Sequence, residues 1–278
     1  MKLFKVILLA ALLTVSTSCT KEKVATEQSK EQETEPIDPC AQQAPLTIPA
    51  CQSSIIQNNK VFIENEKKWL WGGNNDDWHF DITCWTLNEC QLNYGIGREK
   101  FKALTEPKYV SVNSASSSYN SSDRFMIVYT NQEPKVYSIR LLTSHEVIND
   151  VVDGQPIAVA YCVLADLAAV YTRIYCNKEI TFALSGYTYF DPEIWNGLDA
   201  FVFWDRETES LWWPLIDKGV SGLMKDVNLE KYDETKWAEI TWGDIVNKHP
   251  DALVLASGQT MDVPENWTKY QESDLNCN

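Results

Sequence analysis

The sequence has little positive charge. Its 24 lysine and arginine residues are outnumbered by 39 aspartate and glutamate residues, which gives a net charge of −15 at pH 7. Nucleic acids and anionic lipid surfaces bind proteins through basic patches, so the composition argues against both as electrostatic partners. We interpret the negative charge as a source of solubility and expect no nucleic-acid partner.

Long apolar runs are missing beyond the N-terminus. The stretch 6–15 is apolar over about ten residues, too few for a membrane-spanning helix, which needs roughly 20. Two lysines precede it, and small residues lead from it to Cys19. This order resembles a bacterial lipoprotein signal, although Ser16 stands where such signals usually carry a larger apolar residue; ordinary cleavage is the alternative. We therefore expect residues 1–19 to be a signal peptide and Cys19 to be lipidated. The protein is then exported, and this lipid anchor alone holds it on the periplasmic or cell-surface side of a bacterial membrane.

Aromatic residues are absent from residues 20–38, which are rich in glutamate, lysine, glutamine and threonine. Such a segment cannot bury enough apolar surface to offset the entropy lost on ordering the chain. We expect a disordered acidic tether here, followed by a single globular domain over residues 39–278.

The eight cysteines fit an oxidising compartment. If Cys19 carries lipid, seven remain, and at least one of them is unpaired within the chain. Their spacing suggests local bridges between Cys40 and Cys51 and between Cys84 and Cys90, although connectivity cannot be deduced from sequence. The cysteines left over are then Cys162, Cys176 and Cys277.

Short apolar segments separated by polar turns dominate the second half of the chain. Residues 125–129 and 135–139 predict a β-hairpin, and residues 111–123 a loop. Helices are expected to start at Thr143–Glu146 and to cover 241–247. Further expected strands are 157–161, 168–175, 181–184 (stopping at Ser185-Gly186), 200–204, 210–213 and 253–255. This pattern predicts an α+β, β-rich fold, with an antiparallel sandwich or barrel-like sheet and a few short helices.

The segment His145-Glu146-Val-Ile-Asn149-Asp150 is the first candidate for chemistry. In a helix, His145 and Asn149 would share one face, as in the zinc motif HExxH. Amide oxygens are poor zinc ligands beside imidazole, so Asn149 argues against a zinc peptidase. The alternative is structural: His145 hydrogen-bonds within the core and Asp150 caps a turn.

Two other segments carry reactive groups. Cys162, after Tyr161 at the end of an apolar strand, is a nucleophile or a soft-metal ligand once ionised, or an inert packing residue. Asp205 and Arg206 lie in a charged hairpin turn, where a structural role is the default.

These three segments occur in order with residues 78–81, 155–162, 185–186 and 249–255, and together they resemble the uncharacterised family called domain of unknown function 3179, over about residues 68–257. The family pattern HE, two residues, then ND is matched by His145, Glu146, Asn149 and Asp150. Its pattern YCPLC is matched at Cys162, whereas Ala165 replaces the second cysteine. The family has no established activity that the resemblance could imply.

We therefore hypothesise one site built from His145 and Cys162, with Tyr161, Asp205 and Arg206 as further supporting groups beside the HE…ND motif residues. A thiol and an imidazole together either bind a soft metal such as copper or sustain a thiolate next to histidine.

Two alternatives stay open. The first is a non-catalytic surface module that binds a protein partner or a glycan through loops containing Trp71, Trp78 and Trp85, although most of the eleven tryptophans are expected in the core. The second is a degenerate family member, marked by Ala165, that keeps the scaffold without the chemistry.

Overall fold

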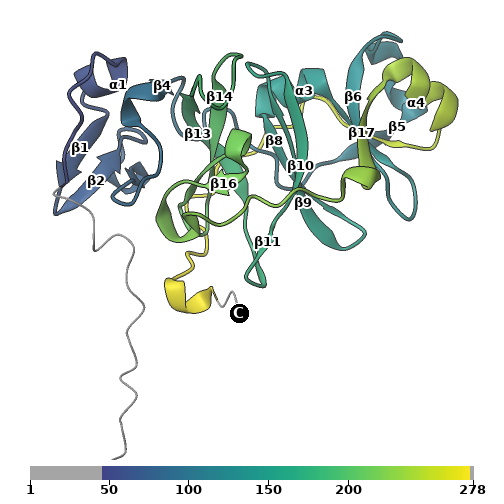
Figure 1. Ribbon diagram of the computed structural model, residues 1–278. Coiled ribbons are helices and arrows are strands. Elements are labelled where there is room, and N and C mark those ends of the chain that lie inside the picture. The colour runs from purple at the N-terminus through teal and green to yellow at the C-terminus, as the bar shows by residue number, and fades with distance from the viewer. Residues whose placement is uncertain (1–45, 276–278) are drawn as a thin grey trace, which may run out of the picture. The chain divides into compact units, whose positions relative to one another are not determined.

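The computed structural model describes residues 46–275 (Figure 1). The predicted signal peptide (residues 1–19), the lipidated Cys19 and the tether (residues 20–38) lie outside this range. Within it, no helix is long and apolar enough to cross a membrane.

The strands of the described residues form five sheets. A three-stranded sheet contains β1 (Val61–Glu64), β2 (Lys67–Leu70) and β3 (Phe80–Asp81), and a second one contains β8 (Val147–Val152), β9 (Gln155–Cys162) and β10 (Leu167–Thr172). A five-stranded sheet has the order β16 (Lys218–Gly219), β15 (Leu211–Trp213), β14 (Ala200–Asp205), β13 (Phe182–Tyr189) and β4 (Leu92–Tyr94). The other has the order β17 (Trp237–Thr241), β6 (Arg124–Val128), β7 (Lys135–Ser138), β18 (Leu253–Leu255) and β5 (Tyr109–Ser111). The last pair is β11 (Ile174–Tyr175) with β12 (Lys178–Glu179).

The α-helices of this range are short: α1 (Ser54–Gln57), α2 (Val112–Ala115), α3 (Ile139–His145) and α4 (Trp242–Lys248). Single 3-10 turns occupy Asp76–Trp78, Glu89–Gln91, Ser116–Ser118, Pro214–Ile216, Gly222–Met224, Glu234–Lys236 and Glu272–Asp274. The predicted β-rich fold with a few short helices is confirmed, and its sheets are antiparallel apart from the pairing of β18 with β7. The sheets of the described range do not close into a barrel.

Strand β9 has an apolar core on each of its faces. Ala160 and Cys162 belong to the cluster that contains the aromatic residues of β13, β14 and β15. Val159 and Tyr161 belong to the cluster around β6, β7 and α3. Because successive strand residues point to opposite faces, the sequence of β9 supplies both cores at once.

Several sequence predictions are confirmed. Strands β6 and β7 form the expected antiparallel hairpin, α4 begins after Thr241, and β18 covers 253–255. All eleven tryptophans are at least partly buried, and Trp204, Trp212 and Trp213 are among the largest fully buried side chains.

Three element predictions are wrong. The segment 143–146 ends α3 instead of starting a helix, and the β-branched residues that follow it form β8. Strand β13 does not stop at Ser185-Gly186 but continues to Tyr189 through an irregularity in its pairing with β14. The predicted loop 111–123 contains α2, whose first turn is capped by the Ser111 hydroxyl.

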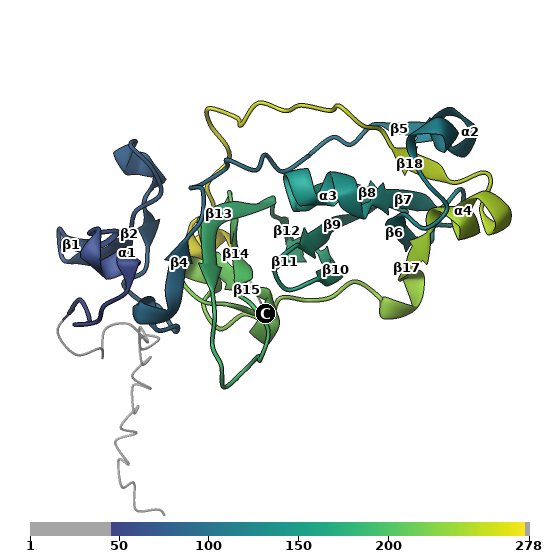
Figure 2. The ribbon, with the colours of Figure 1, turned by 90° about the horizontal axis from the view of Figure 1, so that it is seen from above.

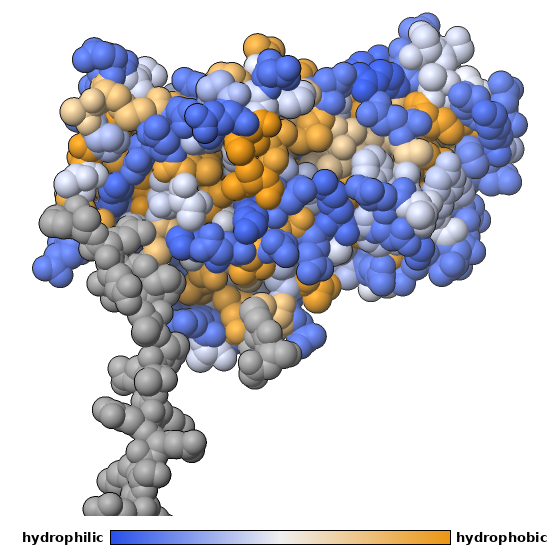
Figure 3. All heavy atoms as spheres, viewed as in Figure 1, coloured by the Kyte–Doolittle hydropathy of each residue, from blue (hydrophilic) through white to orange (hydrophobic). Residues whose placement is uncertain are grey.

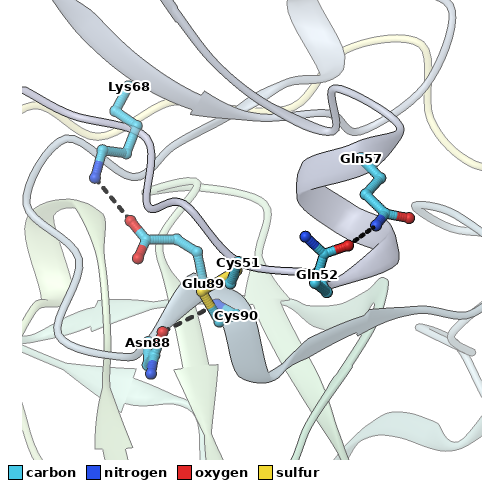
Figure 4. Close-up of a disulfide and its surroundings, with 7 residues drawn as sticks. All are labelled: Cys51, Gln52, Gln57, Lys68, Asn88, Glu89 and Cys90. Atoms are coloured by element: carbon cyan, nitrogen blue, oxygen red, sulfur yellow. Dashed lines mark hydrogen bonds and ion pairs between the residues drawn. A yellow bond between two sulfur atoms is a disulfide. The ribbon is translucent and has the colours of Figure 1, made fainter.

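The predicted disulfide pairing is also wrong. Cys51 bonds to Cys90, so neither Cys40–Cys51 nor Cys84–Cys90 forms (Figure 4). Cys84 and Cys176 are disulfide-bonded as well, and Cys162 is the free cysteine of the described range. Nearness in sequence failed as a guide because the fold brings the segment before α1 against the turn before β4 instead.

The C-terminal segment returns to the sheet of β14. Figure 2 shows the chain running back from β18 along the molecule to the neighbourhood of β13 and β14. There the Trp267 ring lies 5.4 Å from that of Trp204, and the Tyr270 N–H donates to the Glu207 carbonyl at 2.8 Å. Residues far apart in sequence therefore cover one core.

The Asn149 side chain links β8 to β13. Its amide nitrogen donates to the Phe182 carbonyl at 2.8 Å and its oxygen accepts from the Phe182 N–H at 2.9 Å. The same nitrogen lies 3.3 Å from the Leu104 carbonyl. Because Asn149 is buried, these bonds satisfy backbone groups that water cannot reach.

We expect Asn149→Leu to lower the free energy of unfolding by about 2–4 kcal/mol, because each buried polar group left without a partner costs about 1–3 kcal/mol. Urea unfolding measures this, with the exposed Asn113→Leu as a control. A cost no larger than that of the control would show that the link is unimportant.

Removing the Cys51–Cys90 bridge by the double change to alanine should lower stability by about 3–4 kcal/mol, because the bridge closes a loop with a sequence separation of 39. Thermal unfolding of both proteins measures the effect. An unchanged unfolding midpoint would contradict this expectation.

Candidate functional site

The His145–Asp150 segment changes from helix to strand at Glu146. Helix α3 ends at His145, and Glu146 has a φ of 57° in the left-handed region. Asn149 and Asp150 then lie on β8, so His145 and Asn149 do not share a helix face. The helical geometry of the HExxH motif therefore does not form in this segment.

Asp150 is enclosed by polar partners. The Lys135 ammonium lies 2.9 and 3.0 Å from its two oxygens, and the hydroxyls of Tyr137, at 2.6 Å, and of Tyr109 also donate to it. Burial raises the pKa of Tyr137, so its hydroxyl stays protonated and keeps donating. With its charge neutralised by Lys135, Asp150 has a structural role between β8 and β7.

The Cys162 thiol is buried and reduced. The Phe201 N–H donates to its sulfur at 3.4 Å, and the N–H groups of Ala165 and Leu164 donate to it as well. Burial raises the pKa of the thiol, these three donors lower it, and the Glu146 carboxylate raises it; the net direction is upward. The protonated thiol is therefore the favoured form, and the three donors are placed to stabilise the thiolate once the proton is removed.

Cys162 and Glu146 line one cavity of about 260 Å³. Its other walls are mainly apolar: Gly95, Ile96, Phe101, Val163, Leu164, Leu184, Gly186, Tyr187, Thr188 and Phe201. Such a small apolar cavity with few polar groups has the character of a small-molecule site.

A bulge in β13 forms part of the cavity wall. The pairing of β13 with β14 shifts register between Leu184 and Tyr187, and the Ser185 hydroxyl satisfies the freed backbone by bonding the Val202 carbonyl at 2.6 Å. Gly186 has a φ of +81°, and a Cβ there would lie 2.1 Å from the Gly97 carbonyl carbon. Only glycine fits here, and it lines the same cavity as Cys162.

The Glu146 carboxyl has no hydrogen-bond partner among the described residues, although the residue is 93% buried, with 7% of its surface exposed. Burial raises the pKa of this carboxyl to about 7. A largely buried acid without a partner among these residues is costly for the fold, and its place in the cavity wall makes it a candidate for a functional role.

His145, the predicted partner of Cys162, lies outside the cavity. It is half-buried at the end of α3, and its Nδ1 is 2.7 Å from the Lys102 carbonyl. This bond ties the end of the helix to the segment that carries Phe101. The pairing of His145 with Cys162 therefore has no contact to support it, and Glu146 is the ionisable group beside the thiol.

Tyr161, Asp205 and Arg206, predicted as supporting residues, do not line the cavity either. The Tyr161 hydroxyl bonds to Asp166 at 2.7 Å on the opposite face of β9. Burial raises the pKa of Asp205 to about 7, and Thr208 and Trp212 donate to its carboxyl.

Arg206 forms a buried ion pair with Glu99 through bonds of 2.8 and 3.1 Å. Both partners are nearly inaccessible to solvent, so the pair holds the β14–β15 turn against the segment before Phe101. Its role is structural.

The tryptophans proposed for glycan binding are already engaged. The Lys60 ammonium lies 3.6 Å from the centre of the Trp71 ring and 3.8 Å from that of Tyr94. Trp78 lies near the Arg98 guanidinium, and Trp85 packs against the core. Trp71 and Trp78 nevertheless line a cavity of about 270 Å³ together with Tyr94, so binding of a ligand at these rings stays a prediction.

Sequence reasoning missed the wall residues Phe101, Leu184 and Phe201, and it gave Glu146 only a supporting place beside His145 and Cys162. Ser185-Gly186 was the signal that could have located the wall, because a glycine inside a strand pattern indicates a bulge. No sequence signal showed that Glu146, and not its neighbour His145, faces the thiol, because that depends on the left-handed backbone of one residue.

The described part of the chain has no ligand set for a metal ion, because no three histidine, cysteine, aspartate or glutamate side chains are grouped to hold one. Soft ions need further donors besides Cys162.

Comparison with known proteins gives one match. Residues 98–273 match the family described as "Protein of unknown function (DUF3179)". No curated protein and no solved structure matches the chain. The match begins and ends later than the range 68–257 expected from the motifs, and it includes the segments of Glu146, Cys162 and Gly186, which meet in the cavity. Since it covers more than half of the sequence, this chain belongs to that family.

Proposed function

We propose that this protein is an exported, lipid-anchored member of its family in which Cys162 reacts with a small apolar carbonyl compound and Glu146 carries the proton. The observation that supports this most directly is the cavity shared by the thiol and the buried carboxyl, neither of which is paired with another side chain in the described part of the structure.

The proposed step is a reversible addition. The Cys162 sulfur forms a bond to the carbonyl carbon while the carbon–oxygen π bond breaks. The thiol proton passes to the Glu146 carboxylate, and the carboxyl so formed gives a proton to the carbonyl oxygen. The product is a hemithioacetal, and no oxidant or reductant is consumed. A carboxyl with a pKa near 7 suits this role, because it accepts and releases a proton near neutral pH.

Ala165 is compatible with this one-thiol chemistry. The residue stands where the family pattern has a second cysteine, yet its N–H still donates to the Cys162 sulfur. The loss of a second thiol rules out a disulfide between these two positions but leaves the environment of the first sulfur intact. For this reason we favour a functional site over the degenerate-member alternative.

Protection of the thiol tests the proposed addition. A short aldehyde such as butanal should slow the alkylation of Cys162 by iodoacetamide, whereas butanol at equal concentration should leave the alkylation rate unchanged. Mass spectrometry measures this rate. Cys162→Ser identifies the modified residue. Equal behaviour of aldehyde and alcohol would refute the addition.

The pH dependence of alkylation should reveal Glu146. As pH rises through about 7, the carboxyl ionises and its charge raises the pKa of the thiol, which opposes thiolate formation. Glu146→Gln lacks this charge, so we expect it to react faster than the parent above pH 7, by up to about tenfold, the factor of one pKa unit. Below pH 6 the two rates should converge.

The exposed Glu106→Gln is the matched control for that measurement and should follow the parent at every pH. Parallel profiles for the parent and Glu146→Gln would show that the carboxyl does not act on the thiol.

Lipidation is a separate part of the proposal. It is supported by the signal-like N-terminus and by the disulfides, which fit an oxidising compartment. Expressed in a bacterium, the protein should incorporate labelled palmitate and fractionate with membranes, and Cys19→Ala should abolish both. Persistent labelling of the variant would contradict the assignment of Cys19.

A further inference from the structure

The cavity that contains Cys162 opens through an apolar rim. Ile96, Val163 and Leu164 line it and are 44%, 50% and 44% exposed. Ile96 follows β4, and the other two form the turn between β9 and β10. Figure 3 shows hydrophobic residues gathered in the middle of one face of the molecule. Exposed aliphatic side chains at the mouth of a cavity cost solubility unless they contact a ligand.

The charges of the cavity exclude an anionic ligand. No lysine or arginine lines it, and its ionisable members are Glu146, Cys162 and Tyr187. The Tyr187 hydroxyl is already committed to the Trp71 carbonyl at 2.6 Å. Glu146 and the net charge of −15 both oppose a carboxylate or a phosphate near the thiol.

The size of the cavity fits a chain of modest length. A volume of about 150 Å³ accommodates benzene, so the volume of about 260 Å³ found here accommodates a chain of about six to ten carbon atoms. A longer chain would extend from the cavity across the rim.

We infer that the substrate is a neutral aliphatic aldehyde, whose carbonyl meets Cys162 and whose chain leaves the cavity over Ile96, Val163 and Leu164. The aldehyde group rests on the proposed function, whereas the choice of a neutral aliphatic chain rests on the walls and the rim. The rim side chains thereby determine which chain lengths are preferred.

The test is protection of Cys162 from iodoacetamide in the purified full-length protein by a series of straight-chain aldehydes. The protecting concentration should fall by up to about fourfold for each methylene group that becomes buried. Replacing both Val163 and Leu164 by serine should weaken protection by long aldehydes about threefold or more and leave protection by propanal unchanged.

The control replaces two exposed apolar residues outside the cavity, Val151 and Ile63, by serine, and it should behave as the parent. The inference is overturned if protection does not depend on chain length, if carboxylates protect as well as aldehydes of equal length, or if the control loses as much as the rim variant.

Two further outcomes separate the hypotheses. If alcohols protect as well as aldehydes of equal length and the chain-length dependence persists, the proposed thiol addition fails and the assignment of an aliphatic ligand stands. The second outcome concerns binding of the full-length Cys19→Ala protein to phosphatidylcholine vesicles. If serine at 163 and 164 lowers this binding and leaves protection of Cys162 unchanged, the rim is a membrane contact and the inference is overturned.

Discussion

The pairing of β9 along both of its edges is the constraint on which the site depends. Ala160 lies opposite Val147 on one side and opposite Ala169 on the other, so the strand cannot slide without breaking two ladders. A shift by one residue would move Cys162 to the face of Tyr161 and place the thiol in the other core. The register therefore decides that the sulfur faces the cavity, and the buried side chains on both faces hold it there.

Much of the fold could be predicted because its strands are short and clearly patterned. The hairpin of β6 and β7 and the helix after Thr241 follow from local signals. The segment after His145 could not be assigned from the same signals, because a helical end and a strand start meet there within one residue. Disulfide pairing failed for a different reason: the loop between Cys51 and Cys90 is closed by tertiary structure, which local spacing does not encode.

Only part of the candidate site could be predicted from the sequence. Cys162 was identified as a reactive residue, and the structure adds that it is the reduced cysteine among five in the described range. His145 was predicted because a thiol and an imidazole recur together in the matched motifs, yet its ring is bonded to the Lys102 carbonyl. The motif residues differ in role: Asn149 and Asp150 hold sheets together, whereas the Glu146 carboxyl has no partner within residues 46–275. A match to the family motif does not separate structural residues from candidate functional ones, so only burial and hydrogen bonding distinguish them.

The backbone of Glu146 has a consequence for how this position can vary. A side chain in the left-handed region costs about 1–2 kcal/mol relative to glycine, which adopts that conformation freely. Glycine would therefore make a more stable turn between α3 and β8, and it would also end the helix well. The acidic group at this corner therefore comes at a cost in stability that glycine at 146 would avoid.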